Sequence, residues 1–170
     1  PNFLNLTLLG MAIFFHGSIM KFLKATENAI GSTVGILIQF PLYFGIMGMF
    51  QSTGIIQDLS EFFQNISNET TYPIYTFISA GIVNFFVPSG GGQWYIQGPL
   101  VIQSAIEMGI PLNKSIMALA YGDQLTNMMQ PFWAIPLLGI TGLKAKDILP
   151  FTFILMVVGF MVFTIGLLVF

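Results

Sequence analysis

The sequence lacks several groups on which soluble proteins depend. It has no cysteine, one histidine, and only 5 basic and 7 acidic residues among 170. The absence of cysteine excludes a disulfide framework and a thiolate metal site, and the single His16 excludes a multi-histidine metal centre. Charged residues make up 7% of the chain, whereas a soluble domain has about 25%, so a soluble enzyme or binding module is excluded. Five basic residues and a net charge of −2 also argue against a nucleic-acid partner.

Apolar residues dominate instead, at 55% of the chain with a mean hydropathy of +0.82. Such a composition excludes disorder and leaves an integral membrane protein. A membrane helix needs about 20 largely apolar residues. The pattern predicts an all-α polytopic membrane protein that forms one unit, residues 1–170, with spans at about 3–20, 33–56, 115–141 and 148–170 and a polar loop at 57–72. The sequence starts at Pro1 and has apolar runs at both ends, so we expect a piece of a longer protein, and we expect no signal peptide in it.

Two short apolar segments flank a run of proline and glycine, residues 88–92. Each segment has about 14 residues and reaches about 21 Å as a helix, less than the roughly 30 Å of a hydrocarbon core. Basic residues favour the cytoplasmic side, which places Lys21 and Lys144 inside and the acidic loop outside. An odd number of crossings must then separate that loop from Lys144. The segment 115–141 supplies one crossing, so residues 73–108 are predicted to enter the membrane and return to the same side as a re-entrant hairpin. A broken full span over 74–108 is the alternative, and the charge rule disfavours it.

The tip of this predicted hairpin has the features of an anion site. The helix that begins there directs its free N–H groups and its positive dipole end toward the glycine run, where a ligand can approach the backbone closely. The sequence has no arginine, which a dicarboxylate or phosphate site usually recruits, so a singly charged ligand is expected. The predicted substrate-binding residues are Ser89, Gly90, Gly91, Gly92, Gln93 and Trp94.

A second interruption lies in the segment 115–141, which carries an acidic residue near its middle. A charge at such a depth is by default a hypothesis of function. The residues Asp123, Asn127 and Gln130 share one helix face, and Thr126 is adjacent. Their oxygen atoms suit a small hard cation, with Na⁺ as the candidate coupling ion. Burial favours a protonated Asp123 as the alternative, and a structural acid satisfied by Asn127 or a backbone N–H is the third reading. The predicted coupling-ion residues are Asp123, Thr126, Asn127 and Gln130.

No catalytic or metal-centre residues are predicted. Ser89 has no partner base, because the only histidine lies 73 positions away, and the ligands of a zinc site are missing. The residues alone therefore leave three hypotheses open. They are a carrier of a small carboxylate, a cation/proton antiporter that uses Asp123, and a membrane scaffold without transport.

Four stretches of the sequence resemble the bacterial short-chain fatty acid transporter family. The two long ones are residues 84–94 (NFFVPSGGGQW) and 121–133 (YGDQLTNMMQPFW). The two shorter ones are residues 16–17 (HG) and 39–49 (QFPLYFGIMGM). The resemblance covers essentially the whole chain, and the long stretches are specific.

This resemblance implies a secondary carrier of short monocarboxylates such as acetoacetate or butyrate in the bacterial inner membrane, coupled to H⁺ or Na⁺. The chain would be the C-terminal half of such a protein, so the N-terminal half, the lipid bilayer and further copies of the protein are the expected partners. The family is grouped with a wider ion-transporter superfamily of inverted repeats, each with a re-entrant hairpin and an interrupted helix, and elevator-like transport. Its hairpin-tip ligands correspond here to residues 89–93, and its interrupted helix to residues 123–131.

Overall fold

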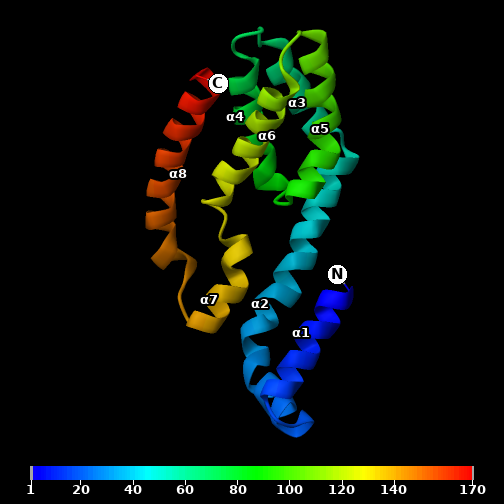
Figure 1. Cartoon of the computed structure of the whole chain (residues 1–170), viewed down its shortest axis with the longest axis vertical. Coiled ribbons are helices and arrows are strands. Elements are labelled where there is room, and N and C mark those ends of the chain that lie inside the picture. The colour runs from blue at the N-terminus through cyan, green and yellow to red at the C-terminus, as the bar shows by residue number, and fades with distance from the viewer. Residues whose placement is uncertain (1, 170) are drawn as a thin grey trace.

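Helices make up the regular structure of the part of the chain that the computed structural model describes, residues 2–169 without the side chains of Ser32, Pro131 and Phe132. In Figure 1 the helices between residues 55 and 127, called the cluster below, lie together at one end, and the last helix runs back beside them. In chain order the elements are α1 (Asn2–Phe15), α2 (Ile19–Ser52), α3 (Ile55–Asn65), α4 (Tyr72–Phe86), α5 (Gly90–Glu107), α6 (Leu112–Asn127), the 3₁₀ helix η1 (Pro131–Ala134), α7 (Ile135–Thr141) and α8 (Ala145–Val169). The expected all-helical class is confirmed over these residues.

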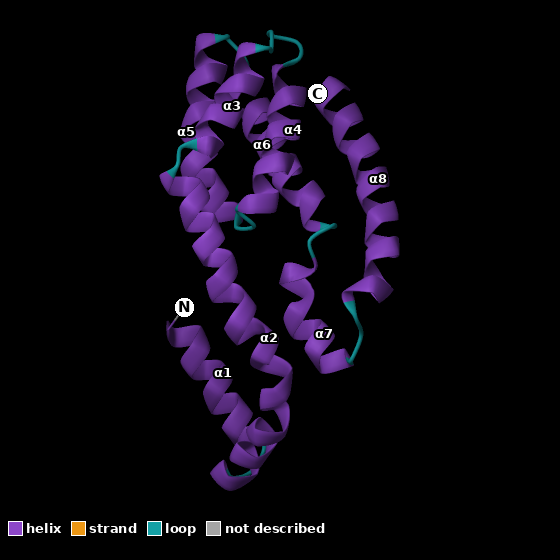
Figure 2. Cartoon of the chain, turned by 180° about the vertical axis from the view of Figure 1, so that it is seen from behind, coloured by secondary structure: helices purple, strands orange, loops and turns teal. Residues whose placement is uncertain are grey.

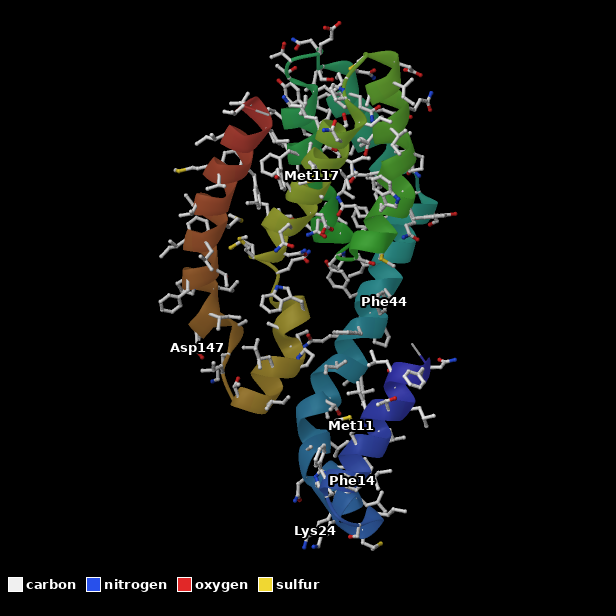
Figure 3. All side chains as sticks on the ribbon, viewed as in Figure 1. Met11, Phe14, Lys24, Phe44, Met117 and Asp147 are labelled. Atoms are coloured by element: carbon white, nitrogen blue, oxygen red, sulfur yellow. The ribbon has the colours of Figure 1, made fainter. Side chains whose placement is uncertain are left out.

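Two helices are long and apolar enough to cross a membrane, α8 and the segment Thr33–Ser52 of α2. A third span is added if α1 and the first part of α2 are counted as one bent span, with 106° between them. Apolar side chains of these helices point outward, and labelled examples on α1 are Met11 and Phe14 (Figure 3). An exposed apolar surface of this size is typical of a membrane protein. The re-entrant path and the inverted repeat stay predictions.

The first helix is shorter than the expected segment 3–20. It ends at Phe15, because Gly17 has a positive φ of 72° and Ser18 caps the next helix by accepting the N–H of Lys21. The following helix begins at Ile19 and continues through Pro41 to Ser52. Its segment Thr33–Ser52, which is long and apolar enough to cross a membrane, lies within the expected range 33–56.

The expected loop at 57–72 is largely helical. Helix α3 occupies Ile55–Asn65 and is strongly amphipathic, with Ile56 and Ser60 buried against the cluster. Its apolar residues have the spacing of one helix face, which predicts a helix. The acidic residues between them made the segment look like a polar loop. Only 66–71 forms a connection (Figure 2), and there the Asn68 side chain accepts the N–H groups of Thr70 and Thr71.

The closest packing in the molecule joins α4 to α6. A Cβ placed on Gly122 would lie 2.3 Å from the backbone oxygen of Phe77 and 2.6 Å from Cβ of Ala80. Opposite, a Cβ on Gly81 would lie 3.3 Å from the Cγ2 of Thr126. Small residues at a helix crossing allow the backbones to approach, as in many membrane proteins.

Buried amides and hydroxyls connect α5 to its neighbours α3 and α4. The Gln97 Nε2 donates to Ser60 Oγ on α3 at 2.8 Å and to Ser79 Oγ on α4 at 3.3 Å. Near the other end of α5, Ser104 Oγ donates to Gln64 Oε1 on α3 at 2.8 Å. Hydrogen bonds between helices in an apolar interior favour one arrangement of the four, because a displaced polar group would lose its partner.

We expect Gly122→Leu to destabilise the protein strongly. A side chain at this position meets the backbone of α4, which cannot move aside as a flexible side chain would. Overpacking costs about 1–3 kcal/mol where side chains can adjust, and more is expected here. Thermal unfolding of the intact protein in detergent would measure the effect.

The matched control is Gly10→Leu on α1, where an added Cβ meets nothing within 4 Å. Equal melting temperatures for the two variants would contradict the tight α4–α6 crossing.

Candidate functional site

Two interruptions of the helices lie side by side at the lower end of the cluster (Figure 1). The first is the glycine tip, defined as residues 88–92, between α4 and α5. The second is the α6 break, defined as residues 128–130, between α6 and η1. Both interruptions lie where the sequence predicts them. Non-helical backbone at membrane depth is tolerated where it is buried in protein or lines a cavity.

The side chain of Asn84, near the end of α4, joins the two interruptions. Its Nδ2 lies 2.8 Å from the backbone oxygen of Asp123, 3.0 Å from Thr126 Oγ1 and 2.8 Å from Asn127 Oδ1. An amide nitrogen carries two hydrogens, so these three acceptors share them. From the other side, Gln130 Nε2 donates to the backbone oxygen of Asn84 at 2.8 Å. The four predicted coupling-ion residues are therefore gathered around one amide.

The glycine tip begins α5 in the geometry that the sequence implies. Ser89 is the N-cap, and its Oγ accepts the N–H of Gly92 at 3.2 Å. The N–H groups of Gly90 and Gly91 belong to the first turn, where no intrahelical acceptor exists. A Cβ on Gly91 would meet nothing within 4 Å, so the space in front of the tip is open.

Asp123 lies beside this tip. A Cβ built on Gly90 would be 3.7 Å from its Oδ2, so the carboxylate faces the positive end of α5. Its Oδ1 is buried and has no hydrogen-bond partner, and the same holds for Oδ1 of Asn84. A buried acceptor without a donor costs about 1–3 kcal/mol. Two such oxygens therefore lie on residues that a hydrogen bond joins.

The other two predicted tip residues have structural contacts. Gln93 is completely buried, and its Nε2 donates to the backbone oxygen of Ala80 and to Gln97 Oε1, each at 2.8 Å. The Trp94 ring lies over its own helix, with ring atoms 2.8–3.0 Å from a Cβ placed on Gly98. The Gln93 hydrogen bond to Ala80 joins α5 to α4, whereas the Trp94 contact lies within α5, and a ligand role for either side chain stays a prediction.

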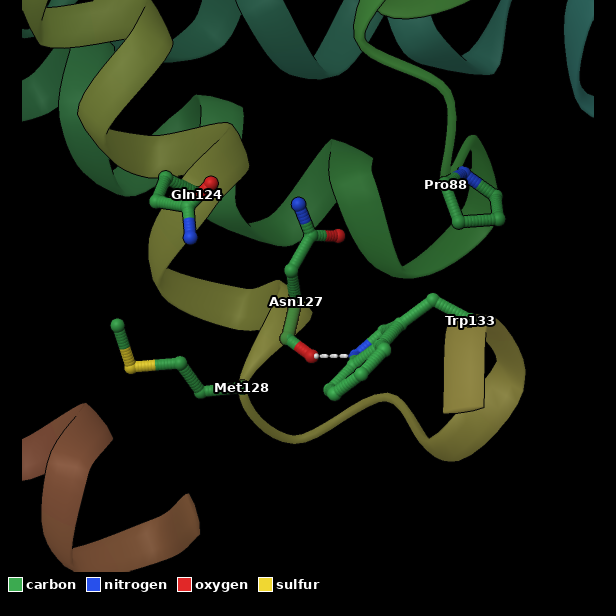
Figure 4. A pocket seen from close by; sticks show the side chains of 5 residues that line it. All are labelled: Pro88, Gln124, Asn127, Met128 and Trp133. Atoms are coloured by element: carbon green, nitrogen blue, oxygen red, sulfur yellow. Dashed lines mark hydrogen bonds between the residues drawn. The ribbon is translucent and has the colours of Figure 1, made fainter. Parts of the chain in front are cut away.

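A cavity of about 410 Å³ opens between the two interruptions (Figure 4). Its lining residues are Pro88, Gln124, Asn127, Met128 and Trp133. The indole Nε1 of Trp133 donates to the backbone oxygen of Asn127 at 2.7 Å, drawn as the dashed line in Figure 4. The amides of Gln124 and Asn127 give the cavity polar groups, and the other lining residues give it apolar walls.

The sequence reasoning missed five of these contributors. They are Asn84, Pro88, Gln124, Met128 and Trp133. Asn84 had a usable signal, because it is a polar residue inside a short apolar segment. For the cavity residues no local signal exists, because their convergence depends on how α6 and η1 meet.

Comparison with known proteins decides the family. The model of the family described as short chain fatty acid transporter matches residues 1–170. The chain belongs to the short-chain fatty acid transporter family. This family of transporters is the one that the four sequence stretches resemble, so that identification is confirmed, and transport rather than enzymatic catalysis is the family's activity.

Two relatives agree with the family. A Haemophilus influenzae protein named "Putative short-chain fatty acid transporter" is 48% identical over 166 residues, and an Escherichia coli K12 protein of the same name is 44% identical over 169 residues. The alignments cover 98% and 99% of this chain but only 37% and 38% of the relatives. The chain thus spans less than two fifths of the length of these relatives. No solved structure matches.

We expect Asn84→Ala to lower the stability of the protein. The change removes the donor that the oxygens of Asp123, Thr126 and Asn127 share, and leaves buried acceptors unpaired, at a cost of about 1–3 kcal/mol. Thermal unfolding of the intact protein in detergent would report this loss. The control Asn113→Ala changes an exposed amide at the start of α6. If both variants melt together, Asn84 does not hold the interruptions in place.

Proposed function

We propose that the chain is part of a secondary active transporter that carries short-chain monocarboxylates, such as acetoacetate or butyrate, across the bacterial inner membrane by symport with H⁺ or Na⁺. Membership of the family supports the substrate class. The observation that carries the mechanism is the position of Asp123 beside the open glycine tip, whose Pro88 lines the cavity with amides and apolar walls.

In this proposal the substrate carboxylate binds at the start of α5. The N–H groups of Gly90 and Gly91 and the positive end of the helix dipole supply the attraction. The cap of Ser89 fixes these groups, so they need no reorganisation when the anion arrives. Backbone amides without an arginine suit a single negative charge better than two.

The coupling follows from the closeness of two negative charges. An ionised Asp123 and a substrate carboxylate would share one helix end, and their repulsion is strong where water is excluded. A proton or a Na⁺ on Asp123, whose buried Oδ1 has no hydrogen-bond partner, removes this repulsion. Ion and substrate then bind together more readily than either binds alone, which is the requirement for symport.

Alternating access completes the proposal. The chain would form the C-terminal half of an inverted-repeat transporter, with a re-entrant hairpin over α4 and α5 and the interrupted helix over α6 and α7. The missing half would cover the open side of the cavity, and the intact protein would work in the inner membrane as one copy or as an oligomer. Interrupted helices with their N-termini at the substrate are a recurrent transporter design.

Gly91→Leu tests the substrate site. Because a Cβ there meets nothing within 4 Å, the side chain should fill the space in front of the tip without displacing the protein's own atoms. We expect butyrate uptake into proteoliposomes by the intact protein to fall at least about tenfold, equivalent to about 1.4 kcal/mol of lost binding. Gly45→Leu on α2, also in open space, should leave uptake unchanged. Normal uptake by folded Gly91→Leu would remove the tip from the substrate path.

Asp123→Asn tests the coupling. The amide has nearly the same shape as the carboxylate but no charge, so it removes both the repulsion and the ion requirement. Labelled butyrate uptake would be driven separately by a Na⁺ gradient at fixed pH and by a pH gradient. We expect one gradient to drive accumulation in the wild type and neither in the variant, which should still exchange internal for external butyrate.

The same experiment distinguishes the alternative function. If the wild type neither accumulates nor exchanges butyrate but exchanges cations across the membrane through Asp123, the cation/proton antiporter hypothesis replaces the symporter.

A further inference from the structure

The cavity between the two interruptions has a polar part and an apolar part. Gln124 and Asn127 contribute amides, while Pro88, Met128 and Trp133 contribute apolar surface. A short monocarboxylate has the same division, with a charged head and an apolar tail. Members of the series differ only in the tail, so the apolar walls of the cavity are what can distinguish one acid from another.

Trp133 is the largest side chain among these walls, and its position is fixed. Its Nε1 donates to the backbone oxygen of Asn127 at 2.7 Å (Figure 4). That oxygen lies at the end of α6 and also accepts the N–H of Gln130 at 3.2 Å. The indole is therefore a second donor to this carbonyl, and its hydrogen bond orients the ring. The side chain remains 55% exposed, so the ring presents a rigid surface that the chain itself does not cover.

Met128 has a different role in the same wall. Its methyl carbon and sulfur lie 3.5 and 3.8 Å from a Cβ placed on Gly159, so the side chain packs against α8. A methionine side chain is flexible and adapts its shape to its neighbours, so Met128 does not set a fixed limit to the length of the cavity. Replacing Met128 would also disturb the contact between α6 and α8, whereas Trp133 can be shortened without opening that contact.

We propose that the ring of Trp133 limits the length of the acyl chain that the site accepts. The proposal rests on the proposed function, because it takes a monocarboxylate as the occupant of the cavity. With the carboxylate at the glycine tip beside Pro88, the tail lies along the apolar walls, and each added methylene needs room that the fixed ring occupies. A pocket discriminates a single methylene by about 10–200-fold. Trp133 is then a specificity-determining residue rather than part of the carboxylate or ion site.

The test measures chain-length preference in the intact protein. Proteoliposomes loaded with unlabelled butyrate take up labelled butyrate by exchange, and unlabelled acetate, butyrate, hexanoate and octanoate compete outside. We expect the wild type to prefer butyrate over hexanoate. In Trp133→Ala the ratio of half-inhibitory concentrations, hexanoate to butyrate, should fall about tenfold. Trp133→Phe keeps a smaller aromatic ring and loses the N–H that orients it, and should give a ratio between those of the wild type and Trp133→Ala.

A second measurement reports binding alone, and it covers the case of a variant that binds an acid but does not transport it. The shift in melting temperature caused by each acid in the purified intact protein gives the same order of preference. Phe151→Ala, which shortens an exposed aromatic on α8 outside the cavity, is the matched control and should keep the wild-type ratio.

The outcomes separate this inference from the proposed function. An unchanged ratio in Trp133→Ala, or an equal change in Phe151→Ala, overturns the role of Trp133 while butyrate exchange by the wild type still supports the carrier. If no acid exchanges or stabilises the wild type, the proposed function itself fails.

Discussion

The backbone contact between α4 and α6 is the constraint on which the rest of the site depends. At Gly122 there is no room for a side chain, because the backbone of Phe77 lies where a Cβ would be. Only at this separation does Asn84 reach three oxygens at the end of α6. A wider crossing would separate the glycine tip from the α6 break, and their residues would no longer line one cavity.

The sequence predicted the two interruptions well, because proline and glycine runs act locally on the backbone. It also placed Asp123 correctly inside an interrupted helix. Two features required the tertiary structure. Gln93 was a plausible ligand by its position in the first turn, but its side chain lies on the buried face of α5, which the sequence did not distinguish from the open face. The cavity wall at Trp133 arises only when the segment after the break folds back onto the end of α6.

The helix α3 illustrates a different kind of error. Acidic and amide residues at 57–72 suggested a loop outside the membrane. That inference used the polar composition of the segment and not the spacing of its apolar residues. The structure shows that Ile56 and Ser60 form a buried stripe on α3 while the charged residues lie on the opposite side. A helix at a membrane surface has an apolar face and a charged face at once. The spacing of its apolar residues is therefore a better guide to such a helix than its average polarity.

The amides between α3, α4 and α5 have a consequence for motion. The buried Gln97 amide on α5 donates to the buried hydroxyls of Ser60 on α3 and Ser79 on α4, and the close crossing at Gly122 joins α6 to α4. Sliding one of these helices past another would break several buried hydrogen bonds in an apolar surrounding. The hydrogen bonds and the crossing at Gly122 therefore resist sliding of α3, α4, α5 and α6 past one another, so a displacement of the cavity relative to α2 would have to move these four helices together.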